Sequence, residues 1–527
     1  MPEPDKKYFG NEPLSDITIE ENKIQSKIHN LRPSSSGGPD NLGPRLLTEI
    51  CDEISYPLAL IYTKSLMEGY VPIDWKQANV TPIFKKGSKS EVGNYRPVSL
   101  TSVVCKLMES LIKDAIVKHI ADNDIVLPTQ HGFMPKKSCL TNLLEYLETL
   151  TKLVDEGHSA DVVYLDFAKA FDKVPHQRLL SKLEAAGITG NVLGWIQDWL
   201  SNRMQRVVLN GKCSEWAEVK SGVPQGSVLG PILFILYIND IDGATTVATT
   251  ISKFADDTKL MCKVNVVNDS ITLQDEINNL YKWSMDWQML FNSTKCKVMH
   301  FGRKNPNVYY TMNGHAPAGT VLEVVDNEKD LGIIIHKSLK PSKQCAAAAK
   351  KANMVLGQMA RAFSYRDKCT WIRLYKQYVR PHLEYAVQAW SPWTDEDIDL
   401  IESVQKRAVN MTYGLKADTY EGKLKELHMT TLQDRRRRGD MIEVWKILKG
   451  HENVKIDTFF KMVDEYSSRT TRLSDSMMLA KPIARLEIRK NFFSHRVIDH
   501  WNSLPFHIKN SPSINSFKNS YDSFFFP

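Results

Sequence analysis

Three aspartates at the ends of short apolar segments constrain this chain most. Asp166 follows the β-type run VVYL, and the pair Asp256–Asp257 lies between ISKF and TKLMC. A strand end holds a carboxylate rigidly, and an Asp-Asp turn between two strands aims both side chains at one point. Converging carboxylates repel one another unless divalent cations lie between them, and Mg²⁺ takes oxygen ligands while keeping positions open for phosphates. The pattern predicts a two-metal site for in-line phosphoryl transfer.

Each motif taken alone also has an ordinary structural explanation. Adjacent acids are common at solvated turns, and a strand-terminal residue such as Asp166 often caps a helix. Between the aspartates lies SGVPQGSVLGPILFILYIND, where Gly222, Pro224 and Gly226 form a turn before an apolar helix expected to start near Ser227. Glycine lets the backbone approach a ligand closely, and a helix N-terminus favours anionic groups. Taken alone, this segment is better explained as a plain loop before a buried helix, so only the combination of motifs indicates a site.

In order and together, the segments resemble the reverse transcriptases of non-LTR (LINE-type) retrotransposons, close to the jockey-like and chicken-repeat-like branches. The blocks are IFKKGSKSEVGNYRPVSLTS, PTQHGFMPKKSCLTNL, YLDFAKAFDKVPHQRLL, SGVPQGSVLGP, FADD, NSTKCKVMHFG and KDLGIII. The resemblance is dense from Leu66 to Lys337 and looser elsewhere. It implies an α+β fold of the right-hand polymerase type, with fingers and an antiparallel palm sheet followed by a mostly α-helical thumb and C-terminal region.

The resemblance also implies the catalytic roles. Asp166, Asp256 and Asp257 would hold two Mg²⁺ ions, with Mn²⁺ as a possible substitute, and the backbone carbonyl of Phe167 would be a further metal ligand. One metal would activate the primer 3′-hydroxyl and the other would stabilise the leaving pyrophosphate. Lys295 matches a lysine that protonates pyrophosphate in related polymerases, and the alternative is a surface lysine beside a strand.

Five residues match the nucleotide-binding positions of the family: Arg96, Lys85, Phe171, Gln225 and Gly226. Arg96 offers a planar fork suited to triphosphate oxygens, and Lys85 would assist it from the adjacent arm of a fingers hairpin unless it belongs to a solvated turn. Phe171 would stack under the incoming sugar and collide with a 2′-hydroxyl; it is also explained as a core residue of a helix AKAFDKV. Gln225 would contact sugar and base, and Gly226 would give the backbone room.

Four residues match positions that contact nucleic acid in the family. Gln130 and Gly132 of TQHGF would meet the template, while Leu331 and Gly332 of KDLGIII would form the primer grip. Asp172 also resembles a family residue, but we expect it to be structural.

Four regions are expected along the chain: an N-terminal extension (1–65) with a flexible template-side loop, fingers and palm (66–337), a helical thumb-like region (338–415) and a basic, mainly helical C-terminal region of unknown role (416–527). With 527 residues the chain is too long for one ordinary core. The net charge of +7 is modest, but residues 337–450 contain 22 Lys and Arg against 13 Asp and Glu. A basic region of this kind attracts phosphates irrespective of base sequence.

Beyond Gly332, helical periodicity replaces the strand signals. Helix-length stretches cover 346–363, 367–390 and 395–414, with Asp395 suited to a helix start and Gly414 to a C-cap. Earlier in the chain, QRVVLNGKCSEWAEV predicts a hairpin with Asn210-Gly211 as its turn. The run Arg435–Arg438 has three explanations: a nucleic-acid contact, a nuclear-import signal or a helix surface. Four adjacent arginines point around a helix and not along one face, so the choice stays open.

Composition excludes several classes of protein. The eight cysteines lack Cys-x-x-Cys spacing and nearby paired histidines, so no zinc ribbon or zinc knuckle is predicted. Scattered thiols of this kind are typical of a reducing compartment. No segment has the apolar length of a membrane span, and MPEPDKKYFG lacks a secretory pattern. We expect a soluble intracellular protein, nuclear at the site of integration and cytoplasmic as an RNA complex.

The predicted function is RNA-directed DNA synthesis in RNA-mediated transposition. The partners are an RNA template, dNTPs and the 3′-hydroxyl of a DNA primer or of nicked target DNA; the oligomeric state is open. The alternative is an inactive or host-adopted RNA-binding relic that keeps the fold. An RNA-dependent RNA polymerase shares the palm carboxylates, but Phe171 argues against it.

Overall fold

A five-stranded sheet near the middle of the molecule brings the site motifs together. The computed structural model describes residues 2–8, 10, 12–246, 248–312, 319–463 and 477–526. The sheet has the order β12-β9-β3-β8-β7. Its strands are β3 (Ala160–Leu165), β7 (Thr249–Phe254), β8 (Asp257–Lys263), β9 (Lys297–Phe301) and β12 (Glu323–Val324).

Both faces of this central sheet are covered, which explains why β3 is an almost unbroken apolar run. Because successive side chains alternate between faces, Val163 and Leu165 enter a core shared with the N-terminal elements. Ala160 and Val162 enter a second core, shared with α5 (Cys139–Asp155) and the C-terminal helices.

A second sheet holds the predicted fingers hairpin. Its strands are β1 (Gln77–Phe84), β2 (Tyr95–Thr101), β4 (Arg203–Leu209), β5 (Lys212–Cys213) and β6 (Ala217–Val219). The predicted turn between β4 and β5 is confirmed, and Asn210 and Gly211 both have positive φ (51° and 77°), as a type I′ turn requires.

The sheets are mixed, whereas the sequence analysis expected an antiparallel palm sheet. β1 runs parallel to β4, and β12 runs parallel to β9. The remaining pairs of the central sheet are antiparallel. Short edge strands such as β12 give little sequence signal for their direction, because direction depends on the loop that brings them back. Two further hairpins are β10 (Thr311–Met312) with β11 (Thr320–Val321) and β13 (Asn327–Asp330) with β14 (Ile333–His336).

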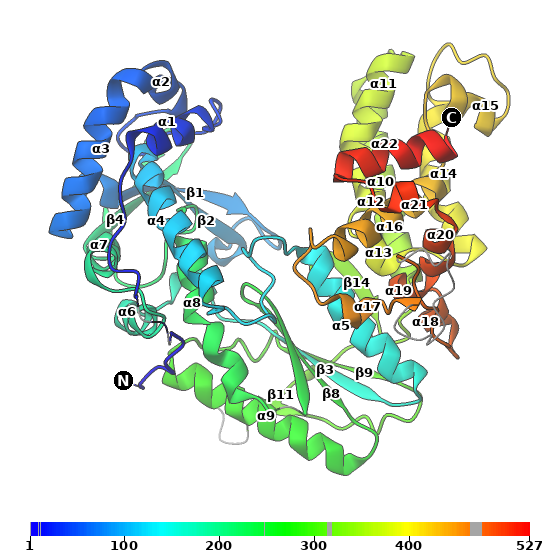
Figure 1. The fold of residues 1–527 in the computed structure, drawn as a ribbon, viewed down its shortest axis with the longest axis horizontal. Coiled ribbons are helices and arrows are strands. Elements are labelled where there is room, and N and C mark those ends of the chain that lie inside the picture. Colours follow the sequence, from blue (N-terminus) through cyan, green and yellow to red (C-terminus); the bar gives the residue numbers. More distant parts are fainter. Residues whose placement is uncertain are drawn as a thin grey trace.

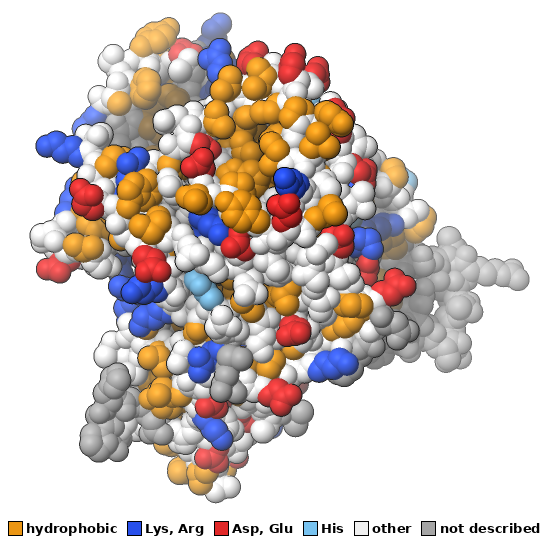
Figure 2. Space-filling model, turned by 90° about the vertical axis from the view of Figure 1, so that its left-hand side faces the viewer, with side chains coloured by type: hydrophobic (Ala, Val, Ile, Leu, Met, Phe, Trp, Pro, Cys, Tyr) orange, Lys and Arg blue, Asp and Glu red, His pale blue; other side chains and the backbone are white. Residues whose placement is uncertain are grey.

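Helices surround the sheets in the first part of the chain. They are α1 (Glu21–His29), α2 (Pro44–Glu49), α3 (Cys51–Glu68), α4 (Val103–Asp122), α6 (His176–Ala185), α7 (Gly190–Leu200), α8 (Gly230–Tyr237) and α9 (Val267–Asp286). The expected helix AKAFDKV is only a 3₁₀ turn, η3 (Ala170–Asp172), because Lys169 before it is left-handed (φ 58°) and Pro175 follows closely. The outer face of α3 exposes Tyr56, Leu60 and Met67, on the side of the molecule where apolar side chains gather in Figure 2.

The described part of the chain after β14 is helical, on the side of the central sheet opposite to α1–α3 (Figure 1). Its longer helices are α10 (Ser342–Ala362), α14 (Asp395–Asn410), α16 (Leu432–Leu448) and α22 (Ile514–Phe525). The shorter ones are α11 (Lys368–Leu374), α12 (Pro381–Glu384), α13 (Val387–Trp390), α15 (Tyr420–Glu426), α17 (Ile456–Phe459), α18 (Glu487–Lys490), α19 (Phe493–Arg496), α20 (Ile498–Ser503) and α21 (Phe506–Lys509).

Two details of the helical prediction differ. The expected helix 367–390 is broken by a π-helical turn at Tyr375–Val379, by Pro381 and by Ala386, which is left-handed (φ 48°). The helix expected from Asp395 begins there, capped by Thr394, but it ends at Asn410, so Gly414 lies in the loop beyond its C-cap. Among the described residues, no helix combines the length and the apolar character needed to span a bilayer.

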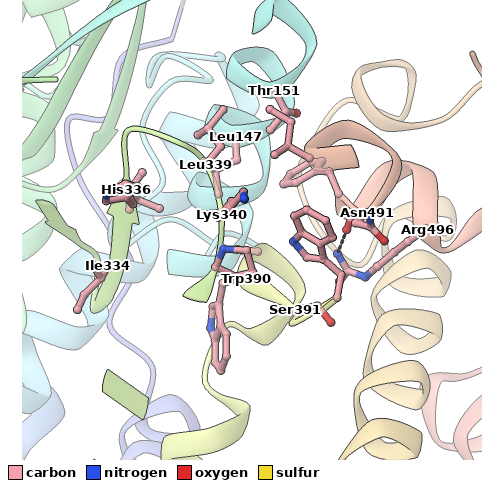
Figure 3. Close-up of a pocket in the computed structure, with 16 residues that line it drawn as sticks. Leu147, Thr151, Ile334, His336, Leu339, Lys340, Trp390, Ser391, Asn491 and Arg496 are labelled. Carbon is pink, nitrogen blue, oxygen red and sulfur yellow. Dashed lines mark hydrogen bonds between the residues drawn. The ribbon is translucent and has the colours of Figure 1, made fainter. Parts of the chain in front are cut away.

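The C-terminal helices dock on α5 through a buried ion pair. Arg489 of α18 pairs with Glu148, donates to the Thr151 hydroxyl at 3.0 Å, and is joined by Ser494, whose hydroxyl donates to Glu148 at 2.6 Å. Nearby, a cavity of about 50 Å³ lies between β14, α5 and α18, with Trp390 and Arg496 in its wall (Figure 3). One apolar core includes residues from both sides of the expected boundary between the thumb-like region and the C-terminal region at 415/416. That division of the chain stays a prediction.

We predict that Arg489→Met destabilises the protein by about 3 kcal/mol, because removal of one partner leaves the buried Glu148 charge uncompensated. The free energy of urea unfolding measures this. Lys490→Met is the matched control: its exposed pair with Glu487 should be worth less than about 1 kcal/mol. Equal effects of the two variants would show that the buried pair does not hold the C-terminal helices in place.

Candidate active site

The register of the central sheet places the two aspartate motifs side by side. Leu165, the last residue of β3, pairs with Thr258 of β8. One step further along each strand, Asp166 therefore stands opposite Asp257. Side chains of directly opposed residues on neighbouring strands have Cβ atoms about 5 Å apart. The expected convergence of residues some ninety positions apart is thus a consequence of strand pairing.

The TQHGF segment is hydrogen-bonded to the turn that carries Asp256 and Asp257. The Gln130 side-chain oxygen accepts hydrogen bonds from the backbone N–H groups of Ala255 (2.9 Å) and Gly132 (2.7 Å). A Cβ on Gly132 would collide with the Ala255 nitrogen, so glycine permits the close approach. Gln130 is only 1% exposed, and its side-chain oxygen serves the turn that carries Asp256. A template contact by Gln130 and Gly132 stays a prediction.

The closeness of the charged groups shifts the pKa values of the Asp pair. Burial and the Asp166 carboxylate raise the pKa of Asp256, while Lys85 and Arg96 act in the opposite direction. Burial, followed by repulsion from Asp256 and Asp330, raises the pKa of Asp257 to about 6. Carboxylates that raise one another's pKa are a feature of functional sites.

Lys85 and Arg96 lie on the predicted fingers hairpin, within electrostatic range of Asp256. β1 pairs antiparallel with β2, so that Ile83 stands opposite Arg96, and the Lys85 N–H donates to the Asn94 carbonyl at 2.8 Å. Gly87 opens the turn with φ 86°. The hairpin prediction is confirmed, and both cations are close enough to affect the pKa of Asp256.

A cavity of about 110 Å³ lies beside the carboxylates, lined in part by Asp166, Asp257, Lys295 and Asp330. The Lys295 ammonium is 3.4 Å from Asp166 Oδ2. That oxygen is buried and accepts no hydrogen bond from the described residues. The predicted general acid is thus in contact with the first predicted metal ligand.

The donor set suits a hard divalent cation, although it is not a closed cage. The described residues contain no cluster of three or more carboxylate, imidazole or thiol groups already arranged around one metal position. Mg²⁺ is commonly held by one or two carboxylates together with substrate phosphates and water, and not by an all-protein cage. Asp166 Oδ2, which has Lys295 nearby but accepts no hydrogen bond from the described residues, and the mutual repulsion of the carboxylates fit such a cation. Phe167, whose carbonyl is the other expected ligand, stacks its ring on Phe291 at 4.5 Å.

The PQG segment packs on β2 of the second sheet. A Cβ on Gly226 (φ 113°) would lie 2.6 Å from the Ser99 carbonyl oxygen, so the close approach requires glycine. The Ser99 N–H donates to the Gln225 carbonyl at 2.7 Å. The Gln225 side chain donates to Asp172 at 2.9 Å. Asp172 therefore orients a predicted nucleotide-binding residue, a role that its sequence position alone did not reveal.

Phe171 is half-buried with one face against the core. Its ring stacks on Phe234 at 4.5 Å and meets Phe133 edge-on at 6.4 Å. This packing is compatible with both explanations of Phe171, as a core residue and as a barrier to a 2′-hydroxyl. A ring that is fixed by packing on one face is a firmer steric barrier.

Helix α8 starts three residues later than the start near Ser227 that the sequence predicted. The helix begins at Gly230, and the N–H groups of Val228 and Leu229 before it donate to the buried Glu109 carboxylate at 2.6 and 3.1 Å. The Ser227 hydroxyl accepts from Gly230 at 3.0 Å. The Glu109 carboxylate therefore occupies the position before this helix where an anionic ligand could have bound.

The predicted primer-grip residues form the turn of the β13–β14 hairpin. Leu331 and Gly332 have positive φ (43° and 94°), and the Tyr385 hydroxyl donates to the Leu331 carbonyl at 2.9 Å. Beside them, the buried Lys259 ammonium contacts Asp330 at 2.6 Å. This pair links β8, which begins at Asp257, to the β13–β14 hairpin. Its two charges are too far apart in the sequence for the pairing to be recognised there.

Comparison with known proteins agrees with this geometry. The chain belongs to the reverse transcriptase (RNA-dependent DNA polymerase) family, whose model matches residues 83–346. It is similar to the RNA-directed DNA polymerase from mobile element jockey of Drosophila melanogaster, at 26% identity over 413 residues, which cover 76% of this chain and 44% of that protein.

Two further relatives come from the same organism. The probable RNA-directed DNA polymerase from transposon X-element is 25% identical over 454 residues, 82% of this chain and 46% of its own length. The one from transposon BS is 26% identical over 415 residues, 75% of this chain and 44% of its own length. The chain thus spans less than half the length of these relatives. The resemblance to jockey-like non-LTR elements is confirmed.

We predict that, without metal, Asp257→Asn stabilises the protein at neutral pH and not in acid. The raised pKa of Asp257, about 6 against 3.8, means that the folded state prefers the protonated form. The penalty is fully present above the folded pKa and disappears as the pH falls below 3.8. Urea unfolding in EDTA at both ends of this window measures it, with the exposed Asp275→Asn as control. An equal gain at both ends would contradict the coupling.

Proposed function

We propose that this protein is an RNA-directed DNA polymerase of a non-LTR retrotransposon. The observation that carries the proposal is the pairing of β3 with β8, which sets Asp166 beside Asp256 and Asp257 within the electrostatic reach of Lys85 and Arg96. Membership of the reverse transcriptase family supports the reaction class. The relatives are named as polymerases of mobile elements, which supports a role in RNA-mediated transposition.

The arrangement of elements supports a division into the fingers, palm and thumb of a right-hand polymerase. In this proposal the β1–β2 sheet is the fingers and the central sheet is the palm, together spanning 66–337. The helices α10–α14 act as the thumb (338–415), residues 1–65 form a template-side extension, and 416–527 support the thumb from α5.

The proposed roles follow from the positions of the side chains. Asp166, Asp256 and Asp257, with the Phe167 carbonyl, hold two divalent cations, Mg²⁺ or Mn²⁺, which the family generally uses. When bound, such ions activate the primer hydroxyl and stabilise the charge of the leaving pyrophosphate. Lys295, in contact with Asp166, is placed to give a proton to the pyrophosphate.

The remaining residues bind and orient the substrates. Arg96 and Lys85 hold the triphosphate of a dNTP. Their charges act on Asp256, so they lie close enough to the carboxylates to meet a triphosphate bound there. Gln225, fixed by Asp172, contacts the sugar and base above the Gly226 backbone. Leu331 and Gly332 support the end of a DNA primer or nicked target strand. Gln130 and Gly132 keep the Asp turn in place beside the RNA template.

We predict that Asp256→Asn reduces primer extension at least about 100-fold while template binding stays within about twofold, because the variant keeps the shape and loses a carboxylate. Extension of a DNA primer on poly(rA) with dNTPs, with and without EDTA, measures the rate, and Asp275→Asn is the control. Binding without synthesis in the unmodified chain would instead favour the inactive RNA-binding relic.

We predict that Phe171→Ala lets ribonucleotides be incorporated. Loss of the ring that stacks on Phe234 removes the barrier to a 2′-hydroxyl. The ratio of incorporation efficiencies, kcat/KM for dNTP over NTP, should fall by about 10-fold or more, which corresponds to about 1.4 kcal/mol of lost discrimination. The exposed Phe363→Ala is the control, and an unchanged ratio would remove Phe171 from this role.

A further inference from the structure

A second polar cavity lies within the C-terminal helices, away from the aspartates. Its volume is about 380 Å³, and its walls are Lys376, Arg380, His428, Met429, Thr430, Arg435, Arg438, Asp522 and Phe526. These residues come from the π-helical turn and Arg380 just after it, the loop before α16, α16 itself, and α22 with Phe526 just after it. None of them lines the cavity beside Asp166 and Asp257.

Positive charge exceeds negative charge in this cavity. Arg435 pairs with Glu384, and Arg438 donates to Asp522 at 2.7 Å. Arg380 shares Glu384, with its Nε 3.5 Å from the carboxylate. Lys376 forms no ion pair with any described carboxylate. Four cations thus surround two carboxylates, and Lys376 is left without a counter-charge.

The cations are held together against their mutual repulsion. Burial, then Arg380 and Arg435, lower the pKa of Lys376. Burial and Arg435 likewise lower the pKa of Arg380. Lys376 lies in the π-helical turn, a rare element that is frequent at functional sites. An anion bound between these side chains would remove the repulsion that folding imposes.

The arginine run that the sequence left unexplained is divided by this geometry. Arg435 and Arg438, three residues apart on α16, face the cavity. Arg436 is 5% exposed and lies inside the helical core, and Arg437 is exposed elsewhere on the helix. The four arginines therefore do not form one continuously exposed basic segment, and two of them line the cavity.

We propose that this cavity binds a phosphate group of a nucleic-acid strand, as a site separate from the polymerase centre. Guanidinium forks suit phosphate oxygens, and the volume falls within the range of small-ligand pockets, which admits a nucleotide unit and not only a bare ion. Met429 and Phe526 provide an apolar wall for the attached sugar or base. The site contacts backbone and reads no base sequence.

The test uses the full chain and a fluorescein-labelled single-stranded RNA, with affinity measured by anisotropy over a series of salt concentrations. Lys376→Gln and Arg380→Gln should each weaken binding by roughly 3- to 10-fold and reduce the slope of log K against log salt by about 0.7, the value for one lost single-strand phosphate contact. Arg437→Gln is the matched control: it belongs to the same run but lies outside the cavity, so affinity and slope should not change. Thermal melting verifies that each variant is folded.

Contact between RNA and Lys376 is measured by acetylating the protein with an amine-reactive reagent, with and without RNA. Mass spectrometry then gives the extent of acetylation at Lys376. Bound RNA should protect Lys376, also in the Asp256→Asn variant, so that a failure of catalysis and a failure of this site are distinguishable. Protection by inorganic phosphate but not by RNA would replace the nucleic-acid ligand by a free anion and overturn the proposal. Slopes in Lys376→Gln and Arg380→Gln equal to that of Arg437→Gln would also overturn it.

Discussion

Like-charge repulsion at the junction of β3 and β8 is the constraint around which the rest of this structure is organised. The strand register sets Asp166 beside Asp257, and the pKa of each member of the Asp pair rises. Cations from the surrounding elements offset this repulsion: Lys295 contacts Asp166, Lys259 of β8 pairs with Asp330, and Lys85 and Arg96 of the β1–β2 hairpin lower the pKa of Asp256. The proposed binding of cations and phosphates at this site would relieve the repulsion.

Buried polar contacts then join the separate parts to this sheet. Glu109 receives the N–H groups before α8, Lys259 ties β8 to the β13–β14 hairpin, and Glu148 holds Arg489 of the C-terminal helices. Apolar packing alone would tolerate small slips between such layers. A buried ion pair does not, because separating its partners exposes an uncompensated charge in a medium of low polarity. The apolar cores provide stability, and these buried polar contacts fix the position of the site within the fold.

Local patterns predicted much of the fold. The apolar runs around the aspartates became β3, β7 and β8, the Asn210-Gly211 turn formed its hairpin, and α14 begins at Asp395. Errors occurred where long-range contacts override local preference. AKAFDKV has helical composition but forms only a 3₁₀ turn, and 367–390 is interrupted by a π-helical turn and by Ala386. The direction of β12 depends on tertiary pairing and left no local signal.

The sequence by itself determined the chemistry of the site, because acid, arginine and glycine identities at fixed spacing are local facts that also define the family. Tertiary structure alone decided which charges meet. It assigned Asp172 to Gln225, Asp330 to Lys259, and two arginines of one run to the cavity around Lys376. The physical reason is that hydrogen bonds and ion pairs depend on distance in space, and residues fifty or more positions apart come within 3 Å only after the sheets and helices have packed.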